Sequence, residues 1–123
     1  IIMTEIFIPG NVPSSKNSKQ WTGKMLINSK ATRKYIKTSS IYYIKDRKKF
    51  LKMLEGKDKP YKLSMQFIRG TKHKFDYLNP AQTIQDLMVK YNWIDDDNCK
   101  EIIPIFELYK YSKENPGVVI TIL

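Results

Sequence analysis

The stretch FDYLNPAQTIQDLMVKYNWIDDDNCKE, from Phe75 to Glu101, decides this fold, and it concentrates acidic residues in a chain that is otherwise strongly basic. Residues 76–101 hold six of the chain's twelve acidic side chains but only two of its twenty-two basic ones, a net charge of −4. The remainder carries twenty basic and six acidic side chains, a net charge of +14. A concentrated carboxylate cluster repels itself, and divalent cations or solvation on a loop usually relieve that repulsion.

The middle of this stretch predicts a helix. Asn79 is a suitable N-cap, Pro80 suits the first helical position, and Gln82 stands where a capping box places its partner. One face is apolar at helical spacing and consists of Ile84, Leu87, Met88 and Tyr91. The opposite side is a polar stripe of Asn79, Gln82, Asp86 and Lys90.

Acidic residues flank the predicted helix at both ends. Asp76 precedes it and Asp95–Asp97 follow it, so its polar stripe can complete a site between them. Carboxylates on separate elements are suitable ligands for Mg²⁺ or Mn²⁺, which can drive phosphodiester hydrolysis. We expect Asp76 and Asp97 to be the main ligands, with Asp96 and Asp86 as further metal-binding or catalytic groups. A bare run of three aspartates is more typical of a solvated acidic turn, and the fixed spacing from Asp76 and Asp86 is what favours a metal site here.

The spacing of these residues is similar to that of a known family. Asp76, Asn79, Asp86 and the pair Asp96-Asp97 stand without gaps where the RusA family of Holliday junction resolvases has its motif. The chain resembles that family over nearly its whole length, at residues 6–17, 29–31, 35 and 117–123. The resemblance implies a Mg²⁺-dependent crossover junction endodeoxyribonuclease, a homodimer whose paired sites cut two symmetric strands of branched DNA.

Two positions depart from the family pattern. Leu78 replaces the second aspartate of the motif, and Gln82 replaces its lysine, so one metal ligand and one cation are missing. Asn79 or Gln82 could serve as neutral oxygen ligands, with Asp95 as an additional carboxylate. Three alternatives stay open: an active resolvase, a weakened or inactive protein that still binds branched DNA, and an interaction protein that uses the acidic stretch as its contact surface.

The net charge of +10 and the isoelectric point near 9.6 favour a polyanionic partner such as DNA. A set of solvated lysines without a ligand is the competing interpretation. Candidate contacts lie in a polar loop, at the start of a helix, in a basic turn and on the acidic helix. The candidate DNA-binding residues are Lys16, Asn17, Lys19, Lys30, Arg33, Lys34, Lys72, Lys74 and Lys90.

The 123 residues suffice for one domain, residues 1–123, with a core of its own. We expect an α+β fold in which a mixed sheet of about five strands carries two main helices. Ser29 is a suitable N-cap for the first helix, which we expect to have a break near Ser39-Ser40. Its expected apolar side consists of Ile41, Ile44, Leu51 and Leu54, with Tyr43 and Phe50 alongside. The expected strands are Thr4–Ile8, Lys24–Asn28, Tyr61–Arg69, Ile102–Tyr111 and Val118–Ile122, and residues 11–23 are expected to form a loop.

Other sequence features bear on the compartment. No apolar run is long enough to cross a bilayer, and the N-terminal residues do not resemble a signal peptide. A single cysteine, Cys99, suits a reducing compartment, and we expect it to be buried by packing. These features predict a cytoplasmic protein, and the family resemblance implies a bacterial host cell and a phage or prophage gene.

Overall fold

The computed structural model describes residues 5–14, 19–23 and 26–123. It confirms the expected fold class, a small α+β domain with a five-stranded mixed sheet and two helices. The elements in chain order are β1 (Glu5–Pro9), β2 (Lys19–Trp21), β3 (Leu26–Asn28), α1 (Lys30–Met53), β4 (Tyr61–Arg69), α2 (Leu78–Lys90), β5 (Ile102–Phe106), β6 (Lys110–Tyr111) and β7 (Gly117–Ile122). Among the described residues, no helix is both long and apolar enough to cross a membrane.

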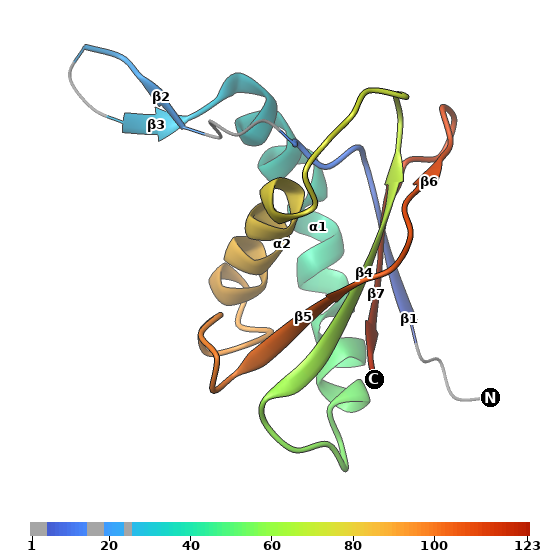
Figure 1. Ribbon diagram of the computed structural model, residues 1–123. Helices are drawn as coiled ribbons and strands as arrows, with labels where there is room; N and C mark the ends of the chain where they lie inside the picture. Colours follow the sequence, from blue (N-terminus) through green and yellow to red (C-terminus); the bar gives the residue numbers. More distant parts are fainter. Residues whose placement is uncertain (1–4, 15–18, 24–25) are drawn as a thin grey trace.

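Strand β4 is the centre of the sheet. It pairs antiparallel with β7 and parallel with β5 and β6, while β1 adds to β7 from the far side. Leu63, Met65 and Phe67 alternate along β4 and are fully buried, which confirms the period-two pattern of the sequence. Strands β2 and β3 pair only with each other and extend away from the sheet (Figure 1).

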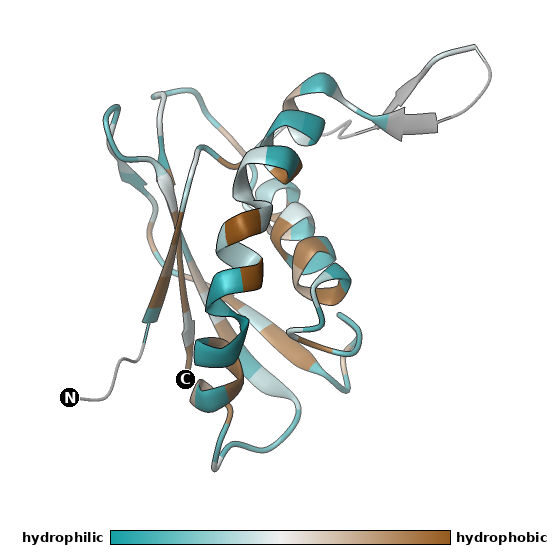
Figure 2. Ribbon diagram, turned by 180° about the vertical axis from the view of Figure 1, so that it is seen from behind, coloured by the Kyte–Doolittle hydropathy of each residue, from teal (hydrophilic) through white to brown (hydrophobic). Residues whose placement is uncertain are grey.

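Both helices pack on the same face of the sheet (Figure 1). Hydrophobic segments concentrate in the strands, whereas hydrophobic and hydrophilic residues alternate along both helices (Figure 2). The buried core joins the sheet to α1, α2 and the loop that follows α2. Its largest fully buried side chains are Trp93, Tyr43, Phe50, Phe67, Ile6, Ile8, Leu63, Met65, Ile84, Met88, Ile120 and Val12.

Helix α1 begins and ends as the sequence predicts. The side chain of Ser29 accepts a hydrogen bond from the backbone N–H of Thr32 (3.3 Å), which confirms the N-cap, and Gly56 beyond the C-terminus has a φ of 76°. The predicted break near Ser39-Ser40 is wrong, because the helix is continuous. The Ser39 hydroxyl donates to the backbone carbonyl of Tyr35 (2.6 Å) and so satisfies its own polar group within the helix.

The predicted apolar side of α1 is confirmed in part. Tyr43 and Phe50 are fully buried, and Leu51 and Leu54 are partly buried against the core. The prediction is wrong at Ile41 and Ile44, which are 65% and 63% exposed, and Tyr35 is buried in addition. The two tyrosines can be buried because their hydroxyls form a hydrogen bond with each other (3.3 Å). Burial raises the pKa of Tyr35 to about 12 and that of Tyr43 well above its usual value, so both phenols stay neutral.

Helix α2 begins earlier than predicted. Its first residue is Leu78 and its N-cap is Tyr77, which makes no side-chain capping bond, so neither the Asn79 cap nor the Gln82 capping box forms. The backbone N–H of Asn79 donates to the carbonyl of Asp76 instead (3.1 Å). Pro80 is still within the first turn, where a missing N–H costs no intrahelical bond. The side chain of Gln82 is therefore available for other contacts.

Three smaller corrections concern loops. Strand β2 lies within residues 11–23, which the sequence predicted as a loop, and Lys24 at the start of the next predicted strand lies outside the described residues. The predicted strand 102–111 is divided into β5 and β6. Cys99 is exposed rather than buried, because it lies in the hydrogen-bonded turn that leads into β5.

The core assignment of α1 can be tested by comparing two of its apolar residues. Replacing the fully buried Phe50 with Ala should lower the free energy of unfolding by about 3–5 kcal/mol, because it leaves a cavity between α1 and Trp93. Replacing the exposed Ile44 with Ala should change it by no more than about 0.5 kcal/mol. Urea unfolding followed by circular dichroism measures both, and equal losses would contradict this orientation of α1.

Candidate active site

The loop after α2 is anchored by Trp93. Its indole N–H donates to the backbone carbonyl of Tyr43 on α1 (2.8 Å), and its ring stacks on Phe50 with centroids 4.7 Å apart. The backbone N–H groups of Trp93 and Ile94 both donate to the carbonyl of Met88 (2.8 and 3.4 Å), so the chain turns back immediately after the helix. Asn92 makes this possible with a φ of 61°, a conformation that asparagine tolerates better than most residues.

This reversal brings the acidic loop beside the polar stripe of α2. The side-chain amide of Gln82 donates to Oδ1 of Asp86 (2.7 Å) and to Oδ2 of Asp97 (3.3 Å). Two carboxylates from different elements therefore share one amide nitrogen, and their oxygens are no further apart than the sum of those two distances. The sequence predicted that the stripe and the loop would meet, and at Gln82, Asp86 and Asp97 they do.

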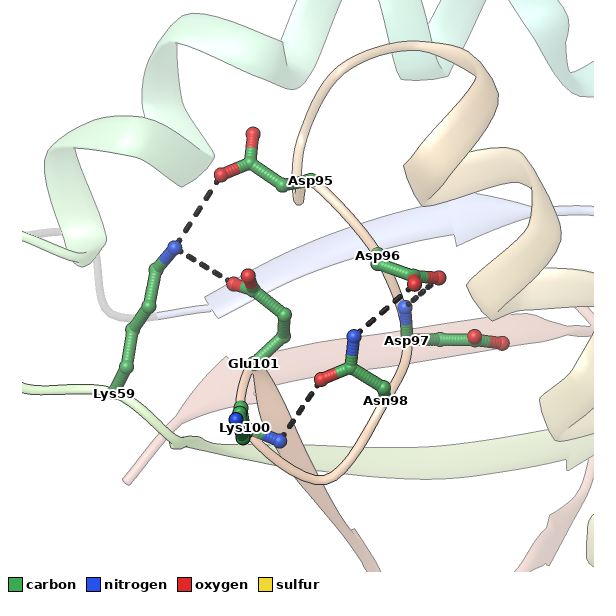
Figure 3. Close-up of polar contacts among 7 residues, drawn as sticks. All are labelled: Lys59, Asp95, Asp96, Asp97, Asn98, Lys100 and Glu101. Atoms are coloured by element: carbon green, nitrogen blue, oxygen red, sulfur yellow. Dashed lines mark hydrogen bonds and ion pairs between the residues drawn. The ribbon is translucent and has the colours of Figure 1, made fainter.

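The three consecutive aspartates have different surroundings (Figure 3). Asp95 points toward Lys59 and forms an ion pair with it (3.3 Å), and Lys59 also pairs with Glu101 (2.7 Å). Asp97 extends to the other side of the loop, toward α2 (Figure 3). Of the three, only Asp97 thus has a hydrogen bond to α2.

Asp96 is held within its own loop. Its carboxylate accepts the backbone N–H of Asp97 (2.8 Å) and the side-chain amide of Asn98 (3.1 Å). Both hydrogen bonds lower the pKa of the Asp96 carboxyl, and the bond from the Asp97 backbone has the larger effect. The Asp96 carboxyl therefore stays ionised. Its role as a ligand stays a prediction.

Among the described side chains, no cation forms an ion pair with the carboxylates near Gln82. The ion pairs formed by these side chains are those of Lys59 alone. Within this described part, Asp86, Asp96 and Asp97 thus lack a cationic partner, although the protein has a net charge of +10. Such hard oxygen donors fit Mg²⁺ or Mn²⁺. Rotation of the Gln82 amide by a half-turn would replace its donor nitrogen with a third oxygen.

The described part of the chain contains no group of three carboxylate, imidazole or thiol side chains close enough to hold a metal ion. Asp76 is exposed, precedes the N-cap by one residue, and its side chain has no hydrogen bond to a described residue. Six residues separate it from Gln82, about 9 Å if all were helical. Asn79 is half-buried at the second position of α2. Among the described residues, no hydrogen bond therefore joins Asp76 or Asn79 to Asp97.

The candidate DNA-binding residues are distributed over several elements. Lys30, Arg33 and Lys34 are exposed at the start of α1, where the first turn contains no acidic residue. Cations there oppose the helix macrodipole, at a cost of about 0.3–1 kcal/mol each, and a bound phosphate would remove that cost. Lys16 and Asn17 lie outside the described residues, and only the backbone of Lys19 is described, in β2.

The remaining three candidates are lysines near aromatic rings or in the β4–α2 connection. The Lys72 ammonium lies 5.1 Å from the ring centroid of Tyr111, and that of Lys90 lies 5.5 Å from the ring centroid of Tyr91. Lys74 is exposed in the connection that leads to Asp76. All three have exposed side chains, which binding of a phosphate backbone requires.

Arg69 is a residue near the site that the sequence did not reveal. Its buried guanidinium donates to the backbone carbonyl of Val12 and to the hydroxyl of Ser14 (3.0 Å), and it lies 4.8 Å from the ring centroid of Phe75. Burial lowers the pKa of Arg69, but an arginine remains charged in proteins. Arg69 therefore joins the N-terminal loop to the segment that carries Asp76, a contact across 57 residues that no local pattern signals.

A scan of this sequence against protein-family models found no match, and a search of curated proteins found none either.

Metal binding at the Gln82 bridge can be measured with Mn²⁺ by isothermal titration calorimetry. Asp97→Asn and Asp86→Asn should each weaken binding by about tenfold or more, because each removes a charged oxygen ligand. Asp95→Asn is the matched control: it lies two residues from Asp97 but faces Lys59, so it should change the affinity by less than about twofold. Equal effects at Asp95 and Asp97 would indicate nonspecific attraction to the acidic loop.

Proposed function

We propose that this protein is a metal-dependent endonuclease that resolves four-way or other branched DNA junctions. The observation that carries the proposal is the bridge of Gln82 between Asp86 and Asp97, two carboxylates without a cationic partner among the described residues. The resemblance of the sequence to the RusA family supports the choice of substrate. The excess of positive charge elsewhere in the chain supports a polyanionic partner.

In this proposal Asp86 and Asp97 would hold Mg²⁺ or Mn²⁺, and Asp76, Asp96 and Asn79 are the further predicted ligands. A bound divalent cation supplies a Lewis acid and lowers the pKa of its water. Asp86 lies on the rigid helix and orients a water for in-line attack. Lys74 or Lys90 stabilises the charge on the departing oxygen.

The positive surface at the start of α1 positions the phosphate backbone beside this site. Lys30, Arg33 and Lys34 provide positive charge there, and the helix macrodipole at its N-terminus also favours an anion. The family resemblance implies a homodimer, in which two copies of the site would face two strands of one junction. It also adds the setting, DNA recombination and repair in the cytoplasm of a bacterial cell, from a phage or prophage gene.

Cleavage of a labelled synthetic four-way junction, beside a matched linear duplex, tests this proposal directly. Paired symmetric nicks should appear with Mg²⁺ or Mn²⁺ and disappear with EDTA. Asp97→Asn should reduce the rate by about 100-fold or more, because a lost ligand removes several kcal/mol of charge stabilisation. Asp95→Asn should cleave at close to the unchanged rate. Metal-dependent nicking that survives Asp97→Asn would refute the assignment.

A second candidate function is non-catalytic binding of branched DNA. Leu78, where the RusA motif has an aspartate, is 71% exposed and offers no ligand, and Gln82 places a neutral amide where the motif has a lysine. Such a protein would keep the basic surface and bind junctions without cutting them under any divalent ion.

Restoring the motif distinguishes the two candidates. Leu78→Asp combined with Gln82→Lys should leave the fold intact, because both side chains are exposed. If the unaltered protein is a weakened nuclease, the double variant should cleave the junction faster by about tenfold or more. Junction cleavage absent from both proteins, with junction binding retained, would assign the chain to the non-catalytic class.

A further inference from the structure

The edge of the sheet beside β4 exposes two tyrosines. Tyr109 is 48% and Tyr111 45% exposed, and Leu108 next to them is among the most exposed hydrophobic residues described. Large aromatic rings are usually buried, and a group of them at the surface commonly marks a binding site. We call Tyr109, Tyr111 and Lys72 the tyrosine surface.

The backbone of this edge is held firmly by β4. Phe106 pairs with Met65 and Lys110 pairs with Ile68. Between these two pairs the edge segment advances by four residues and β4 by three, so the edge segment contains one extra residue, a β-bulge. The Gln66 side-chain amide donates to the carbonyl of Leu108 (3.0 Å) and so satisfies a group that the bulge leaves unpaired. A bulge changes the direction in which the neighbouring side chains point, and this bulge lies next to the two exposed tyrosines.

Each tyrosine ring is supported by the protein. Tyr109 packs edge-to-face on Phe75 (centroids 5.4 Å apart, interplanar angle 88°), and its backbone N–H donates to the hydroxyl of Tyr77 (3.2 Å). The Lys72 ammonium lies over the ring of Tyr111. Both rings are therefore preorganised while much of their surface stays open to solvent.

The tyrosine surface also lies close to a proposed catalytic residue. Phe75, which supports Tyr109, directly precedes Asp76 in the chain. Strand β6 and the β4–α2 connection lie at the same end of the sheet (Figure 1). A ligand on the two rings would thus lie beside the entrance to α2.

The net positive charge around the tyrosine surface indicates which class of ligand it binds. Segments 69–74 and 107–114 together carry five basic and two acidic side chains. Lysines are depleted in the centres of protein–protein interfaces, whereas sites for single-stranded nucleic acid combine cationic side chains with exposed aromatic rings. An unstacked base offers a ring to the tyrosines, and the phosphates of the same strand offer negative charge to Lys72.

We infer that the tyrosine surface binds unpaired nucleobases of single-stranded or branched DNA by stacking them on Tyr109 and Tyr111. This inference rests on the proposed function for its substrate class and deepens it. It explains how a site for phosphodiester hydrolysis would favour a branch point, where bases are unpaired, over a continuous duplex.

The experiment measures fluorescence anisotropy of the full chain in EDTA, with fluorescein-labelled oligothymidylate and a linear duplex of equal length as probes. The double variant Tyr109→Ala/Tyr111→Ala should bind oligothymidylate about tenfold or more weakly, because each stacked base is lost. Its affinity for the duplex should change by less than about twofold. Tyr109→Phe/Tyr111→Phe should retain the affinity of the unaltered protein, since it keeps both rings.

Tyr42→Ala is the matched control, because Tyr42 on α1 also has a lysine over its ring, Lys45 at 5.4 Å. It should leave the preference for oligothymidylate unchanged. In a salt titration, the Tyr109→Ala/Tyr111→Ala variant should bind more weakly at every salt concentration, with an unchanged slope of log affinity against log salt concentration. Lys72→Gln should reduce that slope. Thermal unfolding of each variant shows whether the fold is retained.

Equal loss of oligothymidylate and duplex binding in the Tyr109→Ala/Tyr111→Ala variant would overturn the inference, as would no loss of either. Binding of polyglutamate as tight as that of oligothymidylate would also overturn it, by showing attraction to charge alone. The outcome is separate from that of the cleavage assay. Junction cleavage without selective oligothymidylate binding would reject only the tyrosine surface, and selective binding without cleavage would reject only the nuclease.

Discussion

The structure around the candidate site depends on the burial of Trp93. Its fully buried side chain stacks on Phe50 and donates a hydrogen bond to the backbone carbonyl of Tyr43, both on α1, while its backbone N–H donates to Met88 at the end of α2. Because the ring is fully buried and its only polar atom is satisfied, this contact stabilises the core without a desolvation penalty. It also determines where the acidic loop begins, since Asp95 follows Trp93 by two residues.

Once the loop is anchored, electrostatics separate its three aspartates. Lys59 pairs with Asp95 and Glu101 on one side of the loop, and Asp96 is satisfied by the loop's own N–H groups. Asp97 is left facing α2, where the amide of Gln82 offers a hydrogen bond but no charge. The negative charge that could attract a cation is therefore concentrated between the loop and the helix.

Strand β4 connects this site with the surfaces proposed to bind DNA. Its last residue, Arg69, holds the N-terminal loop through Val12 and Ser14 and lies over Phe75. The same strand pairs with β6, which presents Tyr111. A buried guanidinium needs several acceptors in fixed positions, so Arg69 gives these separate segments one common arrangement.

The sequence by itself determined the Ser29 cap and the strand at residues 61–69, because these follow from local capping and alternation, and the order of such elements predicted the fold class. The sequence also predicted that the α2 stripe would meet the acidic loop, but the burial of Trp93 is what brings the two together. The sequence misplaced Ile41 and Ile44 of α1, which are exposed, and it did not reveal that Tyr35 and Tyr43 pair their hydroxyls in the core, a contact that periodicity does not encode. Only the tertiary structure decided that Asp97 faces Gln82 while Asp95 faces Lys59, because three adjacent identical side chains differ only in their long-range partners.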